Sequence, residues 1–352
     1  MGGAPARSLG GVAPQAYPDD PRRRARFERQ YAQLLQARAE GEAGKERAPE
    51  PGEARGEAAR AFAALTARRA PLRFALASVE HLDTLRRAAC QAAGVEDCPR
   101  ALARLHSGWG GFERASACAA DKAAALAPLA RDGRFCAAYE RLVCDDALPA
   151  MLEALRGSGS EGSEGSEGVF FRGACSLPGG DRAFFQAVPC VRVQQPCDWH
   201  TIRPHFDAQY GHVDATLNFY LPLSEGTFGS AALQLESAEG AEDFVPLALG
   251  HGEAAMFHGA RLAHFTVANA EDVSRYTLDF RVVWGALRTP TAHGGGGENS
   301  VRGEQYEVGA YFSEARREAA SGKWRVVTRG VPSRQHGFPF GSGGEGLGAR
   351  KE

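Results

Sequence analysis

Short alternating segments between residues 169 and 284 constrain the fold of this chain more than any other feature. In each segment apolar residues alternate with polar ones, and Gly, Pro or Asp residues separate one segment from the next. The segments are VFFRG, AFFQAVPCVRVQQP, ATLNFYLPL, AALQLES, DFVPLAL, EAAMFHG, LAHFTVAN and SRYTLDFRVVW. A period of two places successive side chains on opposite faces of a strand. Closely spaced short strands bounded by turn residues predict a mainly β structure, either a sandwich or a barrel.

The residues before this region fall into three parts. Residues 1–70 contain few large apolar side chains, so we expect a largely disordered tail. One candidate helix within it, Arg23 to Ala39, would carry Phe27, Tyr31, Leu34 and Leu35 on one face. Residues 71–156 have the three- and four-residue apolar spacing of helices, which predicts a helical layer that packs on the β core. Pro149 interrupts that pattern and predicts two helices or a kink.

Two further boundaries follow from composition. Residues 157–168 read GSGSEGSEGSEG, contain no apolar residue and predict a flexible linker. The β core then covers residues 169–285. Residues 286–352 form a C-terminal extension, partly disordered, in which EQYEVGAYFSEARREA is the one segment that we expect to be ordered.

Charge and cysteine usage exclude several functional classes. The formal net charge is -2, and no run of about 18 apolar residues occurs, so we expect neither nucleic-acid binding nor a membrane span. The 8 cysteines include no C-x-x-C pair, which argues against a zinc ribbon or a thioredoxin site. No signal-peptide core precedes them, and we expect reduced thiols in the cytoplasm. The Arg-rich stretch from Arg22 to Arg26 suggests an organelle transit peptide, but Asp19 and Asp20 argue against it.

Six of the 10 histidines lie between His200 and His264. Two H-x-D triplets occur there, His205-Phe206-Asp207 and His212-Val213-Asp214. On an extended chain, such a triplet places its imidazole and its carboxylate on the same side. His264 follows roughly sixty residues after His205, so only the fold can bring it alongside.

Two imidazoles and one carboxylate on one face of an octahedron leave three adjacent positions open. That ligand set is typical of non-haem Fe(II) enzymes that bind a bidentate co-substrate together with dioxygen. The residues alone leave His212 and Asp214 as a rival pair, and they leave His258 as a rival to His264. We expect His200 and His251 to be surface or turn histidines.

A basic residue follows the candidate metal ligands at a short interval. Arg275 lies roughly ten residues beyond His264, and Thr277 would share its strand face. A guanidinium binds a carboxylate with two parallel hydrogen bonds, so this pair predicts an anchor for the far carboxylate of 2-oxoglutarate. Either Asn218 or Tyr220 would add a donor to 2-oxoglutarate if their strand face lines the barrel.

Further polar residues on these strands leave alternatives open. Asp279 and Arg281 continue the face of Arg275, either as a buried pair that orients the anchor or as a solvated strand end. Asn218 and Tyr220 would be exposed polar residues if their face lies outside the barrel. Asn269 is expected to form a turn.

The stretch from Phe184 to Val283 resembles the phytanoyl-CoA-hydroxylase-like superfamily of Fe(II)/2-oxoglutarate oxygenases, and within it the streptomycin-biosynthesis-type oxygenases. The similar segments are PCVRVQQP, HFDAQYGH, LNFYLPL, LQLES, DFVPLALGHGEAAMFHGARLAHFTVAN and SRYTLDFRV, with FCAAYERLVCDDALPAML as a helical lead-in. The resemblance implies a double-stranded β-helix (a jelly roll, cupin-like), His205, Asp207 and His264 as iron ligands, and Arg275 as the 2-oxoglutarate anchor. It favours His205 and Asp207 over His212, which then lies behind the ligands or faces substrate.

The resemblance also implies the activity. Such an enzyme would use Fe(II), 2-oxoglutarate and O2, with ascorbate as a supporting reductant, and would release succinate and CO2. Hydroxylation of a small-molecule metabolite is the expected outcome, because the carboxylate of Asp207 leaves no ligand position for halide. A cupin-like metalloenzyme that does not use 2-oxoglutarate and an inactive barrel that serves as a binding module are the alternatives.

Overall fold

The computed structural model describes residues 21–43, 53–108, 128–157, 174–290, 298–299, 304–331, 334–335 and 338–339. Its α-helices are α2 (Pro21–Ala43), α3 (Glu53–Thr66), α4 (Val79–Ala93), α5 (Pro99–Ala103), α6 (Leu105–Gly108), α8 (Gly133–Leu142) and α9 (Leu148–Gly157). Short 3-10 turns are η1 (Leu129–Arg131), η3 (Ala174–Ser176), η4 (Asp207–Tyr210) and η5 (Gly229–Ala231), and η2 (Val143–Ala147) is a π-helical turn.

The largest sheet is antiparallel and has the strand order β1-β9-β4-β11-β2-β14-β15, and β3 also pairs with β11. Its members are β1 (Leu72–Ala75), β2 (Arg182–Gln186), β3 (Cys190–Gln194), β4 (Thr216–Pro222), β9 (Glu253–Phe257), β11 (Arg275–Trp284), β14 (Phe312–Arg317) and β15 (Trp324–Thr328). A smaller sheet has the order β10-β6-β7, with β6 (Leu233–Leu235), β7 (Val245–Leu247) and β10 (His264–Phe265). The remaining pairs are β5 (Gly226–Thr227) with β8 (Leu249–Gly250), β12 (Glu298–Asn299) with β13 (Glu304–Gln305), and β16 (Arg334–Gln335) with β17 (Phe338–Pro339).

The two faces of the large sheet differ in polarity. In β11, Tyr276, Leu278 and Phe280 point to one side and join the main hydrophobic core. Residues that alternate with these three along β11, including Arg275 and Asp279, line a pocket on the other side of the sheet. The expected alternation is therefore present, and it separates an apolar helix-facing surface from a polar pocket.

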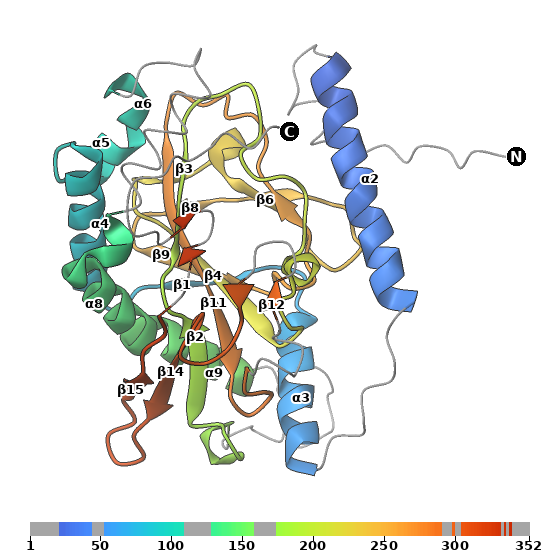
Figure 1. Cartoon of the computed structure of the whole chain (residues 1–352), viewed down its shortest axis with the longest axis vertical. Coiled ribbons are helices and arrows are strands. Elements are labelled where there is room, and N and C mark those ends of the chain that lie inside the picture. Colours follow the sequence, from blue (N-terminus) through green and yellow to red (C-terminus); the bar gives the residue numbers. More distant parts are fainter. Residues whose placement is uncertain are drawn as a thin grey trace, which may run out of the picture.

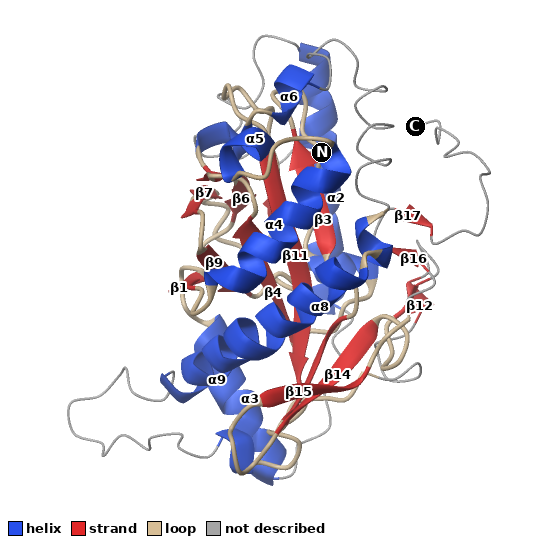
Figure 2. Ribbon diagram, turned by 90° about the vertical axis from the view of Figure 1, so that its left-hand side faces the viewer, coloured by secondary structure: helices blue, strands red, loops and turns tan. Residues whose placement is uncertain are grey.

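Helices cover the apolar face of the large sheet (Figures 1 and 2). Buried residues of α4, α8 and α9 pack against β4 and β11, and Tyr139 of α8 contacts Phe280 with its ring edge. The interruption expected at Pro149 is present as the π turn η2, in which the N–H of Leu148 bonds to the carbonyl of Val143. Proline has no N–H and does not fit a regular helix interior, so a widened turn just before it is the local consequence.

We expected a largely disordered tail over residues 1–70, and this prediction is wrong for two parts of it, which are helical. The candidate helix Arg23 to Ala39 is confirmed as α2, which runs from Pro21 to Ala43, and α3 is a second helix. Phe27, Tyr31 and Leu34 of α2 are buried against the outer side of the smaller sheet. Few apolar residues suffice here because three of them are large and share one helix face, and the sheet supplies the partner surface.

The β core is also larger than the expected residues 169–285. Strand β1 adds an edge from within the predicted helical layer, and β14 and β15 add the other edge from the C-terminal extension. β14 lies in the segment expected to be ordered, and β2 pairs with it from Phe312 to Arg316. The linker residues 158–168 and the segment VFFRG lie outside the described residues. No described helix is both long and apolar enough to cross a bilayer.

Candidate metal centre

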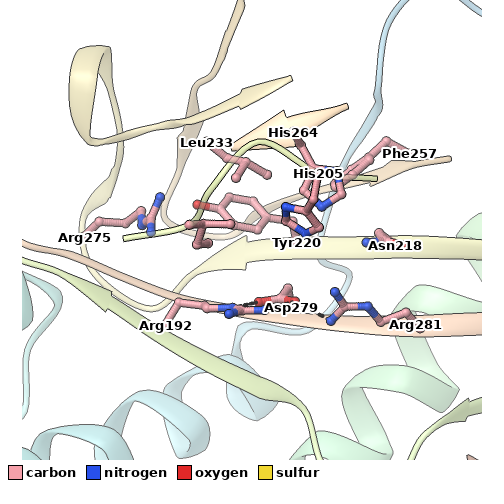
Figure 3. A pocket seen from close by; sticks show the side chains of 11 residues that line it. Arg192, His205, Asn218, Tyr220, Leu233, Phe257, His264, Arg275, Asp279 and Arg281 are labelled. Carbon is pink, nitrogen blue, oxygen red and sulfur yellow. Dashed lines mark hydrogen bonds and ion pairs between the residues drawn. The ribbon is translucent and has the colours of Figure 1, made fainter. Parts of the chain in front are cut away.

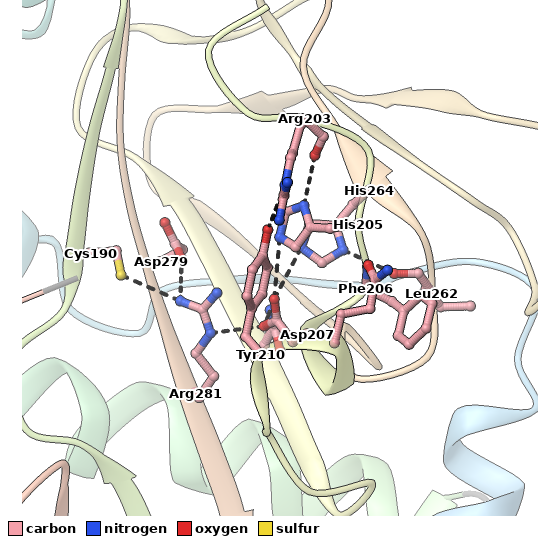
Figure 4. Close-up of polar contacts among 12 residues, drawn as sticks. Cys190, Arg203, His205, Phe206, Asp207, Tyr210, Leu262, His264, Asp279 and Arg281 are labelled. Atoms are coloured by element: carbon pink, nitrogen blue, oxygen red, sulfur yellow. Dashed lines mark hydrogen bonds and ion pairs between the residues drawn. The ribbon is translucent and has the colours of Figure 1, made fainter. Parts of the chain in front are cut away.

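His205, Asp207 and His264 meet at one end of the pocket between the two sheets (Figure 4). The ligand atoms of all three lie within 4.8 Å of one another, and all three residues are buried. Antiparallel backbone bonds between His205 and His264 place the two imidazoles side by side, with ring centroids 4.3 Å apart. Asp207 opens the 3-10 turn η4 directly afterwards. The fold thus brings the H-x-D triplet and the distant His264 together in one cluster, as expected.

Hydrogen bonds to the backbone fix how each imidazole is protonated. Nδ1 of His205 lies 2.8 Å from the carbonyl of Arg203, and Nδ1 of His264 lies 2.9 Å from the carbonyl of Leu262. A carbonyl can only accept, so each Nδ1 carries the proton and each neutral ring presents a lone pair at Nε2. Burial, together with neighbouring His264, lowers the pKa of His205 to about 4, which keeps that ring neutral at physiological pH.

Asp207 presents one carboxylate oxygen to the histidines and keeps the other occupied. Oδ1 lies 3.4 Å from Nε2 of His205 and 3.6 Å from Nε2 of His264. Oδ2 accepts hydrogen bonds from Nδ2 of Asn218 at 2.8 Å and from Nε of Arg281 at 2.9 Å. Burial alone would raise the pKa of Asp207, but the adjacent Arg281 guanidinium outweighs it and holds the pKa well below its usual range.

This geometry leaves three acceptors facing one another. Two imidazole lone pairs and Oδ1 of Asp207 converge, and no donor lies between them among the described side chains. Buried acceptors without donors are costly, and a divalent cation satisfies all three at once. The residues therefore fit a metal ion bound by two histidines and one carboxylate.

Gly259 permits the hydrogen bond between Asn218 and Asp207. A Cβ at this position would lie 2.4 Å from the Asn218 amide. The carbonyl of Gly259 also accepts the N–H of Asp207 at 2.8 Å. The sequence analysis missed this glycine, because its role comes from the close approach of the turn after β9 to strand β4, which no local pattern indicates.

The far end of the pocket contains a buried guanidinium without a counter-ion. Arg275 is 1% exposed, and its Nη1 donates to the carbonyl of Ala231 at 3.3 Å. Its Nε has no hydrogen-bond partner, and no carboxylate among the described residues pairs with it. An unpaired buried cation is unfavourable on its own and indicates a binding site for an anion.

Two hydroxyl groups lie beside Arg275. Thr277 follows it on the same face of β11, and the Tyr220 ring lies between Arg275 and the histidines with its hydroxyl toward the guanidinium (Figure 3). Both hydroxyl oxygens are buried and without a hydrogen-bond partner. Burial raises the pKa of Tyr220, although Arg275 opposes that rise, so its hydroxyl stays a donor. The amide of Asn218 is committed to Asp207, and its predicted contact with 2-oxoglutarate stays a prediction.

A row of alternating charges forms the floor of the pocket (Figure 3). Arg281 donates from Nη1 to Asp279 at 2.6 Å, and Arg192 of β3 donates from Nε to the other oxygen of Asp279 at 2.8 Å. Of the two alternatives for Asp279 and Arg281, the buried pair is present, and Arg281 contacts the candidate metal ligand Asp207 rather than Arg275. Arg192 was missed, although a charged residue inside an apolar strand is a signal that could have found it.

The rival residues of the sequence analysis do not belong to this cluster. His212 packs on Tyr306 with a centroid distance of 4.3 Å, and Asp214 pairs with Arg261. His258 contacts the Asp214 carbonyl through Nε2 at 2.6 Å.

Two smaller expectations had different outcomes. The expected surface position of His200 is wrong, because its ring is buried against Phe27 of α2. The turn expected at Asn269 is present, since its side chain bonds to the backbone of Glu271 and Val273.

Comparison with known proteins gives a partial likeness. No protein-family model matches the chain. A stretch of 103 residues is 27% identical to the streptomycin biosynthesis protein StrG of Streptomyces griseus. That stretch covers 29% of this chain and 48% of the relative, so the chain spans about half the length of the curated relative it matches.

Two solved structures resemble this chain distantly. A non-heme monooxygenase, the ThoJ–Ni complex, has 18% identity and a TM-score of 0.34, and the match covers 62% of this chain and 77% of that one. The non-heme alpha-ketoglutarate-dependent epimerase SnoN from nogalamycin biosynthesis has 13% identity and a TM-score of 0.32, with 80% and 97% covered. Likeness at this level supports no conclusion about the reaction, which must be argued from the site itself.

Proposed function

We propose that this protein is an Fe(II)- and 2-oxoglutarate-dependent oxygenase that acts on a small-molecule metabolite. One observation carries the proposal: a three-acceptor metal site and an unpaired buried guanidinium lie at opposite ends of one pocket. A metal site at one end of the pocket and the Arg275 guanidinium at the other suit a ligand with two separated anionic groups. 2-Oxoglutarate has such groups, with a keto acid that chelates iron and a second carboxylate beyond it.

The residues of this chain have distinct roles in that reaction. His205, Asp207 and His264 would hold Fe(II), while Arg281 and Asn218 keep one Asp207 oxygen away from the metal. Arg275 would bind the far carboxylate, and Thr277 and Tyr220 would donate to it. When bound, the iron supplies the redox chemistry by which O2 converts 2-oxoglutarate to succinate and CO2 and transfers the second oxygen atom to substrate.

The proposal includes the fold assignment as a double-stranded β-helix. A pocket lined from both sheets, with ligands on a loop before β4 and on β10, is what that fold provides. A metalloenzyme of similar fold that does not use 2-oxoglutarate is disfavoured by Arg275. Such an enzyme would have no need for an unpaired buried cation opposite the metal.

A binding experiment without oxygen tests the proposal before any substrate is known. The protein is titrated with Fe(II) and then with 2-oxoglutarate, and the charge-transfer absorption of the chelate is followed. We expect binding of one Fe(II) and then one 2-oxoglutarate, followed by slow succinate release when air and ascorbate are added. Wild-type protein that binds Fe(II) but not 2-oxoglutarate would favour the alternative metalloenzyme, and protein that binds neither would refute the proposal.

A further inference from the structure

Helix α2 covers the back of the segments that carry both histidine ligands. Along these two paired segments, His205 and His264 face the pocket, while their neighbours Phe206 and Phe265 belong to the hydrophobic cluster on the opposite side. α2 fills that side, with the Phe27 ring 5.3 Å from the Phe265 ring, edge to face. The metal site therefore lies on one side of the ribbon that these two paired segments form, and α2 lies on the other.

One ion pair connects α2 to this ribbon. Arg38 donates from Nη1 to Oε1 of Glu236 at 3.2 Å and from Nη2 to Oε2 at 2.8 Å. The Glu236 side chain is completely buried, and its Oε2 also accepts the N–H of Ala263 at 3.0 Å. Nη2 of Arg38 additionally donates to the carbonyl of Arg261 at 3.2 Å. The pair thus holds two peptide groups in the short segment just before a metal ligand.

The held segment determines the orientation of His264. Leu262 lies between the two peptide groups that Arg38 and Glu236 bind, and its carbonyl accepts Nδ1–H of His264. That bond sets the tautomer and the direction of the Nε2 lone pair. The Arg38 guanidinium also lies over the ring of Phe206, 5.7 Å from its centroid, between the other two ligands. Arg38 is therefore in contact with both segments that carry the metal ligands.

We propose that Arg38 and Glu236 are positioning residues of the metal centre, and that docking of the N-terminal helix determines its metal affinity. This inference rests on the proposed metal site but not on 2-oxoglutarate. Replacement of residues that orient metal ligands typically lowers metal affinity by about 10- to 100-fold. We expect a loss of that size for Arg38→Ala, because Glu236 then lacks its counter-ion and the segment before His264 loses the hydrogen bond from Arg38 to the Arg261 carbonyl.

The test is a Co(II) titration of the full chain, with Co(II) as an air-stable replacement for Fe(II) and its visible absorption as the signal. Arg38→Ala should bind Co(II) about 10- to 100-fold more weakly and with an altered spectrum. Arg38→Lys should recover part of this affinity, since it keeps the charge but not the forked contact. Arg29→Ala is the matched control, because Arg29 is exposed on the same helix, and it should bind like wild type.

A purely structural role would give a different pattern. If Arg38→Ala lowers thermal stability but binds Co(II) as wild type does, the inference is wrong and the proposed function is unaffected. If Arg38→Ala does not fold, Glu236→Gln and Arg38→Lys decide, and wild-type affinity in both would overturn the inference. Wild-type protein that binds no Co(II) and no Fe(II) would refute the metal site itself.

Discussion

The unpaired guanidinium of Arg275 gives the sharpest test of the co-substrate. In the pocket it has one neutral contact, to the Ala231 carbonyl, so its charge is available to a ligand. We consider Arg275→Met, which keeps the side-chain length but removes the charge and the donors. Removal of one partner from a buried, charge-assisted hydrogen-bonded pair costs about 2–5 kcal/mol, partly because the other charge is left unpaired. This corresponds to a loss of roughly 30- to 5,000-fold in affinity.

A pair of ligands isolates that contact. 2-Oxopentanoate has the same chain length and keto acid as 2-oxoglutarate, but a methyl group replaces its far carboxylate. Anaerobic titrations of the Fe(II) protein should show that wild type prefers 2-oxoglutarate by the factor given above, whereas Arg275→Met binds the two ligands about equally. Equal weakening of both ligands, or loss of Fe(II) itself, would show that Arg275 supports the pocket and does not bind the carboxylate.

Arg275→Met, which should weaken 2-oxoglutarate binding, should not lower the stability of the ligand-free protein. A buried cation without a counter-ion destabilises the folded state. Arg275→Met should therefore leave the thermal midpoint unchanged or raise it, as expected where function is kept at a cost in stability. A clear decrease in the midpoint measured by calorimetry would indicate a stabilising partner for Arg275.

Three further predictions concern the metal ligands and the thiols. Asp207→Ala should abolish succinate release and weaken metal binding; unchanged release would exclude the proposed ligand set. Arg281→Met should destabilise the metal-free protein by about 3–5 kcal/mol, because it leaves Asp207 buried without a counter-ion, while Asp279 keeps only Arg192; denaturation with and without Co(II) should show a smaller loss when metal neutralises Asp207, and an equal loss would contradict this. Burial raises the pKa of Cys144 to about 12, so this thiol stays protonated and should resist alkylation at pH 8 until the protein unfolds, as mass spectrometry would show.

Local sequence patterns predicted which residues come together in the pocket better than they predicted the elements that surround it. The sequence grouped His205, Asp207 and His264 because metal binding requires particular residue types, and the structure brings these three together. The period of two in β11 placed Arg275 and Thr277 on one face. The choice between His205 and His212 needed more than the residues, since both belong to an H-x-D triplet. In the structure, His205 pairs with His264 through backbone hydrogen bonds, whereas His212 packs among tyrosines.

Residues that act through tertiary contacts could not be predicted. Arg38 lies in the predicted helix Arg23 to Ala39, but no local pattern indicated that this helix packs against the smaller sheet. Gly259 is required because Asn218 approaches its backbone, and Gly259 lies in the turn after β9 whereas Asn218 lies on β4. Arg192 finds its partner Asp279 on a neighbouring strand. Such pairings depend on sheet register, which neither segment determines alone.

The register of β11 explains why two arginines on one strand have different roles. Arg281 lies opposite Asn218 of β4, and both donate to Asp207, so this end of the strand supports the metal ligand. Arg192, Asp279, Arg281 and Asp207 alternate in sign, and their charges cancel as a row. Arg275, at the start of the strand, lies outside that row and keeps its charge. A shift of one residue in β11 would turn Tyr276 and Phe280 into the pocket, and Arg275, Asp279 and Arg281 toward the helices. The unpaired Arg275 guanidinium and the neutral row of charges thus depend on one strand pairing. Because of this arrangement, the pocket is positive at both ends once a metal is bound, and it therefore suits a dicarboxylate.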